Sequence, residues 1–198
     1  MSLKFNKGKV ADGGREFTPI SSGIHTARIV QIADVGVHAR EFQGVAKEPA
    51  SQLVFTFEVQ EDGDAKLISK QVVVSDFYGD PQGRPNSGLV DIFLAATGKV
   101  PSLSEGLDVE TLLGAPVMLT IVKNKNNRST IKRGGITGVP RGTAVPAAQS
   151  ELLIFDFDNP DLDVKEKLFG FAGNLIDQAL GTKGAGSASE DTETGSDF

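Results

Sequence analysis

The chain contains no cysteine and no tryptophan, and only one tyrosine and two histidines among its 198 residues. The absence of cysteine excludes disulfide bonds, thiolate nucleophiles and cysteine-ligated zinc. Since the histidines are His25 and His38 alone, a histidine-based triad or zinc site has few possible members. The phosphate-binding loop GxxxxGK[ST] is also missing. We therefore expect no enzyme, and no bound metal or cofactor.

Long apolar runs are absent as well. No run approaches the ~20 residues that span a bilayer, and residues 1–4 do not open a signal peptide. We expect a soluble protein of one domain with appendages, and no membrane partner. The net charge of −6 is unevenly placed: residues 1–150 hold 17 Lys and Arg against 15 Asp and Glu, and residues 151–198 hold three against eleven. A mildly basic body joined to an acidic end does not exclude a nucleic-acid binder.

Three early segments alternate apolar and polar residues, which predicts a meander of three strands. They cover residues 23–33, 52–60 and 67–78. The expected core residues of the second strand are Leu53, Phe55, Phe57 and Val59. The composition of residues 61–64 predicts a hairpin turn, and residues 34–49 are expected to form a long loop or an irregular hairpin.

Helix signals follow the meander. Ser87 predicts the N-cap of a short helix that ends at Gly98, and residues 108–113 predict a second helical turn. The later expected elements are a strand pair over residues 115–123 and 129–138, a Pro/Gly/Ala linker over 139–150, a brief strand over 152–157 and a helix over 161–180.

This order of elements fits a mainly β chain: a five-stranded Greek-key barrel of the oligonucleotide/oligosaccharide-binding (OB) kind. A short helix would lie between strands three and four, and a C-terminal helix would dock on the barrel. The pattern also allows another small barrel or a sandwich. Arg28 shares a strand face with apolar residues, so we expect it to escape at a barrel rim or to pair with an acid. The expected parts are a basic arm (1–22), the core (23–160), the docked helix (161–180) and a tail (181–198).

Four segments carry a family likeness. The run SGIHTARIVQIADVG, residues 22–36, resembles the first strand of tailed-phage single-stranded-DNA-binding proteins, which begin with a similar G-x-[apolar]-x-A-R pattern. Residues 53–58 resemble their second strand, residues 112–117 their LLG entry into strand four, and residues 154–156 their late FD segment. The resemblance covers roughly residues 20–180. It implies an OB fold, a role in phage DNA replication or recombination, and a place in the cytoplasm of the infected bacterial host.

A groove that binds single strands without sequence preference needs cations for phosphates and aromatic rings for bases. Residues 123–133 hold five positive charges and no acid, which makes this hairpin the best basic candidate. Its candidate residues are Lys123, Lys125, Arg128, Lys132 and Arg133. The alternative is a charged hairpin tip that prevents edge-to-edge aggregation.

Two further candidates supply aromatic residues beside cations. Arg40 and Phe42 lie in the segment after the first strand, where Phe42 is either a stacking platform or a loop anchor in the core. Lys66, Lys70 and Tyr78 lie on or after the third strand, and Tyr78 is the expected exposed platform. The remaining phenylalanines of the strands and the C-terminal helix, Phe169 and Phe171 among them, are read as core or docking residues.

The C-terminal segment GTKGAGSASEDTETGSDF, residues 181–198, lacks the apolar surface that would offset its ordering entropy, so we expect it to be disordered. Its acidic and aromatic residues are Glu190, Asp191, Glu193, Asp197 and Phe198. Such a tail can compete with DNA for a basic groove and dock replication or recombination proteins. The alternative is a solubilising terminus.

The sequence therefore favours sequence-independent binding and protection of single-stranded DNA. The rival interpretation is a non-catalytic protein-interaction or virion module built on a small β barrel. The aspartates between residues 156 and 163 could chelate a divalent cation, but they lack the glycine and final glutamate of a calcium loop. A solvated helix N-terminus explains them better. Salt-sensitive binding to oligonucleotides separates the two function classes.

Overall fold

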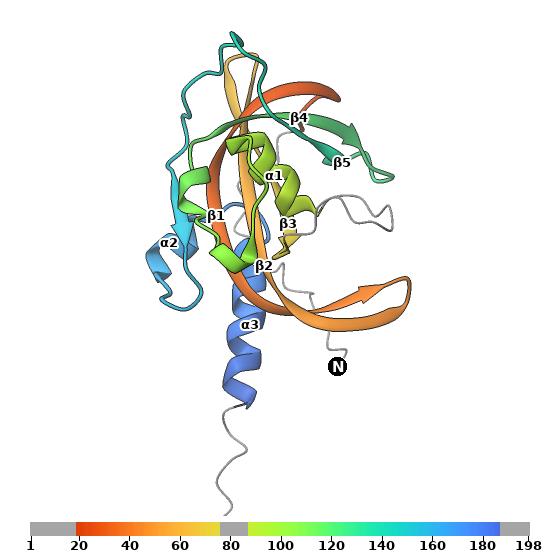
Figure 1. Ribbon diagram of the computed structural model, residues 1–198, viewed down its shortest axis with the longest axis vertical. Coiled ribbons are helices and arrows are strands. Elements are labelled where there is room, and N and C mark those ends of the chain that lie inside the picture. The colour runs from red at the N-terminus through yellow and green to blue at the C-terminus, as the bar shows by residue number, and fades with distance from the viewer. Residues whose placement is uncertain (1–18, 76–86, 187–198) are drawn as a thin grey trace, which may run out of the picture.

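The computed structural model describes residues 19–75 and 87–186. Within these residues, six strands and five helical segments follow one another (Figure 1). The strands are β1 (Gly23–Phe42), β2 (Val45–Glu61), β3 (Asp64–Val73), β4 (Pro116–Lys123), β5 (Ser129–Thr137) and β6 (Leu153–Phe155). The helices are α1 (Gly88–Thr97), η1 (Leu103–Glu105), η2 (Glu110–Leu112), α2 (Leu162–Lys167) and α3 (Ala172–Gly186).

The strands form one sheet in the order β3-β2-β1-β4-β5, in which all neighbours are antiparallel. The short strand β6 joins β1 in parallel, beyond the point where β4 leaves it. No ladder of hydrogen bonds joins β3 to β5 among the described residues, so the sheet is open there. The chain is thus mainly β with a few helices, as predicted, but the sheet is not a closed five-stranded barrel.

Strands β1 and β2 form one long hairpin. Its outer part covers residues 34–49, and of the two predictions for this segment the irregular hairpin is confirmed and the loop is wrong. The pairing shifts register between Asp34 and Val37 and again between His38 and Arg40. The turn consists of Gln43 and Gly44, which have φ values of 54° and 77°. Two positive φ angles give the turn type that suits the twist of a tight hairpin.

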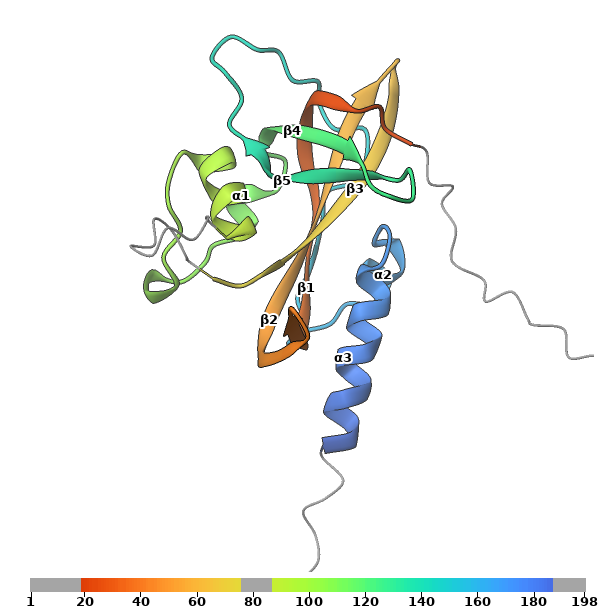
Figure 2. The same cartoon turned by 90° about the vertical axis from the view of Figure 1, so that its right-hand side faces the viewer.

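Helix α1 covers the open side of the sheet, where it contacts β3, β4 and β5 (Figures 1 and 2). As predicted, the Ser87 hydroxyl accepts the Val90 N–H at 3.1 Å, and Gly98 ends the helix in the left-handed conformation. The apolar face of α1 joins the main core, which includes Leu89, Ile92, Phe93 and all four expected residues of β2: Leu53, Phe55, Phe57 and Val59. The core therefore lies between the sheet and α1.

The prediction of one helix over residues 161–180 is wrong, because the chain breaks it into α2 and α3. Gly170 has a φ of 74°, which a helix does not accommodate. The buried Gln31 amide of β1 fixes the break: its oxygen accepts the Phe169 N–H at 2.9 Å, and its nitrogen donates to the Lys167 carbonyl. Helix α3 continues to Gly186, six residues into the predicted tail.

Helix α3 packs on the other face of β1 and β2, beside β6 (Figure 2). This second core consists of Ala33, Val35, Val54, Phe155, Phe157, Ala172, Ile176 and Ala179. The β1–β2 hairpin is therefore apolar on both faces near its base, which explains why Val54 and Phe55 are both buried although they point to opposite sides. No helix in the described part of the chain is long and apolar enough to cross a membrane.

The predicted linker, residues 139–150, has no regular secondary structure but is fastened to the sheet. Arg28 is half-buried and donates to the carbonyls of Gly114, Val145 and Pro146, so its partners are backbone carbonyls rather than the acid that was one of the two predictions. Glu58 accepts the Gln149 N–H at 2.9 Å and the Ser150 N–H at 2.7 Å. We call residues 145–150 the strap.

Candidate nucleic-acid interface

The β4–β5 hairpin presents cations on a well-defined turn. The Asn124 side-chain oxygen accepts the Asn126 N–H at 2.9 Å and the Arg128 N–H at 3.0 Å, which closes the turn. Asparagine favours such turns because its short side chain can form a hydrogen bond with the backbone of the residue two positions later. Because the Asn124 side chain and backbone hydrogen bonds hold the turn, the side chains of Lys125 and Arg128 are not needed for it and are exposed to solvent.

Farther along β5, the exposed residues Lys132 and Arg133 are adjacent, in the stretch between Ile131 and Ile136 where the pairing with β4 shifts register. Arg133 interacts electrostatically with Lys70 of β3 and Asp91 of α1. Burial lowers the pKa of Lys70, and the positive charge of Arg133 lowers it further against the opposing effect of Asp91. Burial raises the pKa of Asp91, while Lys70 and Arg133 oppose that change. Lys70 of β3, Arg133 of β5 and Asp91 of α1 therefore influence one another electrostatically at the open side of the sheet.

The β1–β2 hairpin presents a second pair of cations. Arg40 and Lys47 are register partners on its two strands. Both line a cavity of about 530 Å³ between the outer part of the hairpin and β3, together with Gln71 of β3. Their hairpin also carries Glu41 and Glu48, so its local charge is balanced, in contrast to the β4–β5 hairpin.

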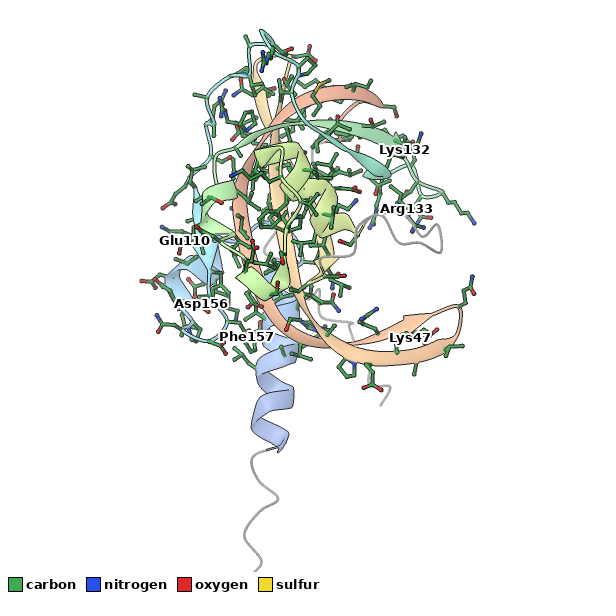
Figure 3. The ribbon with its side chains drawn as sticks, in the orientation of Figure 1. Lys47, Glu110, Lys132, Arg133, Asp156 and Phe157 are labelled. Atoms are coloured by element: carbon green, nitrogen blue, oxygen red, sulfur yellow. The ribbon has the colours of Figure 1, made fainter. Side chains whose placement is uncertain are left out.

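The two hairpins project from the same side of the sheet (Figures 1 and 2). Lys47 lies on the lower one, with Lys132 and Arg133 on the upper one (Figure 3). Lys70 belongs to the end strand β3 and interacts electrostatically with Arg133 of the upper hairpin. We call Arg40, Lys47, Lys70, Lys132 and Arg133 the inter-hairpin surface. Lys47 is not among the residues predicted from the sequence, because its position opposite Arg40 depends on the register of the hairpin.

Two lysines of the predicted site, Lys66 and Lys123, form structural contacts within the chain. Lys66 forms an ion pair with Glu61 at 2.5 Å and donates to the Pro19 carbonyl. Lys123 donates to the Ile20 carbonyl and the Ser129 hydroxyl, both at 2.8 Å. These ammonium groups hold the segment that enters β1, and we leave them out of the inter-hairpin surface.

The predicted stacking platforms lie outside the described residues: the side chain of Phe42, and Tyr78 as a whole. The same holds for Glu190, Asp191, Glu193, Asp197 and Phe198 of the tail. Phe171, which was read as a core or docking residue, is 40% exposed at the break between α2 and α3. Nothing in the alternation of the sequence distinguishes it from its buried neighbours, because the break depends on Gln31.

The arrangement can neutralise phosphates along a path from one hairpin to the other. Arginine and lysine donate hydrogen bonds to phosphate oxygens, and these contacts do not depend on the base sequence. Comparison with known proteins gives no match to any family model, curated protein or solved structure.

Proposed function

We propose that this protein binds single-stranded nucleic acid, DNA in the first instance, without sequence preference. The observation that carries the proposal is the placement of cations from two separate hairpins on one side of the sheet, with Lys70 of β3 in electrostatic interaction with Arg133. A single strand needs such a cationic path for its phosphates, whereas a duplex reader needs an element that enters a groove.

The strand order supports an OB-like fold. The order β3-β2-β1-β4-β5 becomes a five-stranded ring if β3 and β5 are taken as neighbours. OB folds are partly open barrels, and α1 occupies the place between the third and fourth strands where the sequence predicts a helix. OB folds bind oligonucleotides beside the loops joining strands one and two and strands four and five. Those loops are the tips of the two hairpins here.

The wider role stays a proposal that rests on the family resemblance. We propose that binding protects single strands during phage DNA replication or recombination, inside the infected bacterial cell. The acidic residues after Gly186 would compete with DNA for the inter-hairpin surface, and Phe198 would dock partner proteins. Flexible anionic segments suit both tasks physically.

Fluorescence anisotropy of a labelled dT oligonucleotide, titrated with the full chain at two salt concentrations, tests the proposal. We expect binding that weakens as salt rises and that an unlabelled single strand displaces better than a duplex of equal length. The absence of binding at low salt would contradict the proposal and favour a protein-interaction module.

A further inference from the structure

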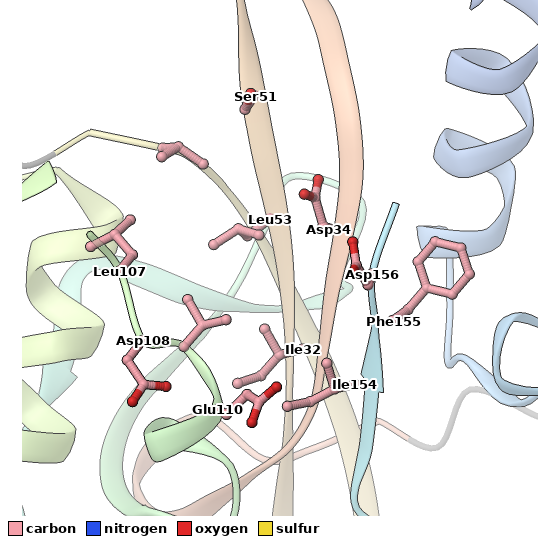
Figure 4. Close-up of a pocket in the computed structure, with 12 residues that line it drawn as sticks. Ile32, Asp34, Ser51, Leu53, Leu107, Asp108, Glu110, Ile154, Phe155 and Asp156 are labelled. Carbon is pink, nitrogen blue, oxygen red and sulfur yellow. The ribbon is translucent and has the colours of Figure 1, made fainter. Parts of the chain in front are cut away.

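A second cavity lies away from the inter-hairpin surface, between β1, β2, β6 and the segment before η2 (Figure 4). Its volume is about 470 Å³. The apolar lining comes from the strands and includes Ile32, Leu53 and Ile154. Unlike the inter-hairpin surface, this cavity has only acidic charged residues in its wall.

The carboxylates stand in two groups on opposite sides of the apolar floor. Asp34 and Asp156 lie together on one side, and Asp108 and Glu110 on the other (Figure 4). They are not gathered as ligands of one metal ion, and no metal-binding group occurs among the residues that the structure describes. An occupant that suits this wall has an apolar centre and a positive charge at each side.

The electrostatics of Asp34 also favour a cationic occupant. Burial raises the pKa of Asp34, and the charges of Asp158 and Asp156 raise it further, against a hydrogen bond from the Gly36 N–H at 2.8 Å. A positive group in the cavity would relieve this repulsion between carboxylates.

The chain itself contains a segment of this chemistry in the part that precedes Pro19. Residues 3–9 read LKFNKGK, in which Phe5 stands between Lys4 and Lys7. We propose that residues 3–9 dock in this cavity of their own chain, with Phe5 on the apolar floor and the two lysines toward the two carboxylate groups.

The length of the intervening chain allows this docking. Phe5 precedes Pro19 by fourteen positions, and an extended chain of fourteen steps spans roughly 46 Å at ~3.3 Å per residue. That reach is comparable with the diameter of a small domain. Tethering also gives the arm an effective concentration near millimolar, which favours docking within one chain over docking on a second copy.

Distance measurement between two spin labels tests the docking on the full chain. Because the protein has no cysteine, Ser2→Cys and Asn159→Cys introduce the only two labelling sites. Asn159 is exposed and follows Asp156 by three residues. We expect a narrow distribution of short distances that broadens at high salt. In the Asp108→Asn/Glu110→Gln background the narrow population should be lost.

The matched control is Glu105→Gln/Glu166→Gln, which removes the same charge from two exposed residues outside the cavity and should leave the narrow population unchanged. Circular dichroism and urea midpoints verify that each variant is folded. A broad distribution in the parent chain would overturn the proposal. A narrow population that persists in the Asp108→Asn/Glu110→Gln variant would also overturn it. So would a narrow population that arises only between two different chains, as seen in a mixture of singly labelled proteins. No nucleic acid is present, so the result is independent of the proposed function.

Discussion

Arg28 and Glu58 are cross-strand partners on β1 and β2, and both bind the backbone of the same strap, residues 145–150. Arg28 holds the carbonyls of Val145 and Pro146, while Glu58 holds the N–H groups of Gln149 and Ser150. Burial raises the pKa of Glu58, but the hydrogen bonds from Ser150, Gln149 and Gln60 outweigh it and lower the pKa overall. The pair thus ties an irregular segment to the middle of the sheet.

Replacing Glu58 by glutamine should destabilise the protein. The amide keeps the size of the side chain but removes the negative charge that accepts the strap N–H groups, and Glu58 is only 3% exposed. Hydrogen bonds to a charged group contribute about 1.5–3 kcal/mol, so the free energy of unfolding in urea should fall by that order. Glu48→Gln, at an exposed position, is the control. Equal stability of the two variants would refute the role of the strap bonds.

Acid should remove the stabilisation that Glu61 provides. Hydrogen bonds from Lys66 and Ser21 lower the pKa of Glu61 from 4.5 to about 2. Because the folded pKa is depressed, the contribution is complete above pH 4.5 and is lost as the pH falls towards 2. The difference in unfolding free energy between the parent chain and Glu61→Gln should therefore shrink over that window. Glu105→Gln, which changes an exposed side chain, should show no such trend; a constant difference for Glu61→Gln would argue against the ion pair.

Charge removal on β5 should lower the salt dependence of DNA binding. For single strands the slope of log K against log salt is about −0.7 for each phosphate contact. If Lys132 and Arg133 each contact a phosphate, Lys132→Gln/Arg133→Gln should reduce the magnitude of the slope by about 1.4. Arg141→Gln, an exposed cation outside the surface, should leave it unchanged. Equal slopes in the parent chain and both variants would show that Lys132 and Arg133 do not contact the DNA phosphates.

Removal of the residues after Gly186 should strengthen binding of dT oligonucleotides at low salt. These twelve residues carry four acidic side chains and no basic one, so they compete with DNA for cations. The truncation keeps α3 whole, because that helix ends at Gly186. The gain should vanish at high salt, where screening weakens the competition. An unchanged affinity at low salt would show that the tail does not compete with DNA, and partner docking would be its one remaining proposed role.

Most strands and the caps of α1 are predictable because their signals are local. The alternation from Leu53 to Val59 and the Ser87 cap each depend on a few neighbouring residues. The break between α2 and α3 is not predictable in this way, because it depends on Gln31, 138 residues before Phe169. A helical pattern of apolar residues continues across that break and gives no sign of it.

The candidate site shows the same division. The sequence identifies the cations of residues 123–133, but it does not show that Lys123 has a structural partner while the others are exposed. The structure shows it, because the Lys123 ammonium donates a hydrogen bond to the Ile20 carbonyl, 103 residues away in the chain. Lys70 and Arg133 come together only when the sheet curls, since β3 and β5 lie at its two ends.

The most direct measurement is photochemical cross-linking of an oligonucleotide that contains 4-thiothymidine, followed by identification of the cross-linked peptides. We expect cross-links to both hairpins, residues 37–50 and 123–133, and we expect excess unlabelled dT to remove them together. Cross-links confined to α3 or the strap, or their complete absence at low salt, would contradict the claim that the two hairpins form one single-strand-binding surface.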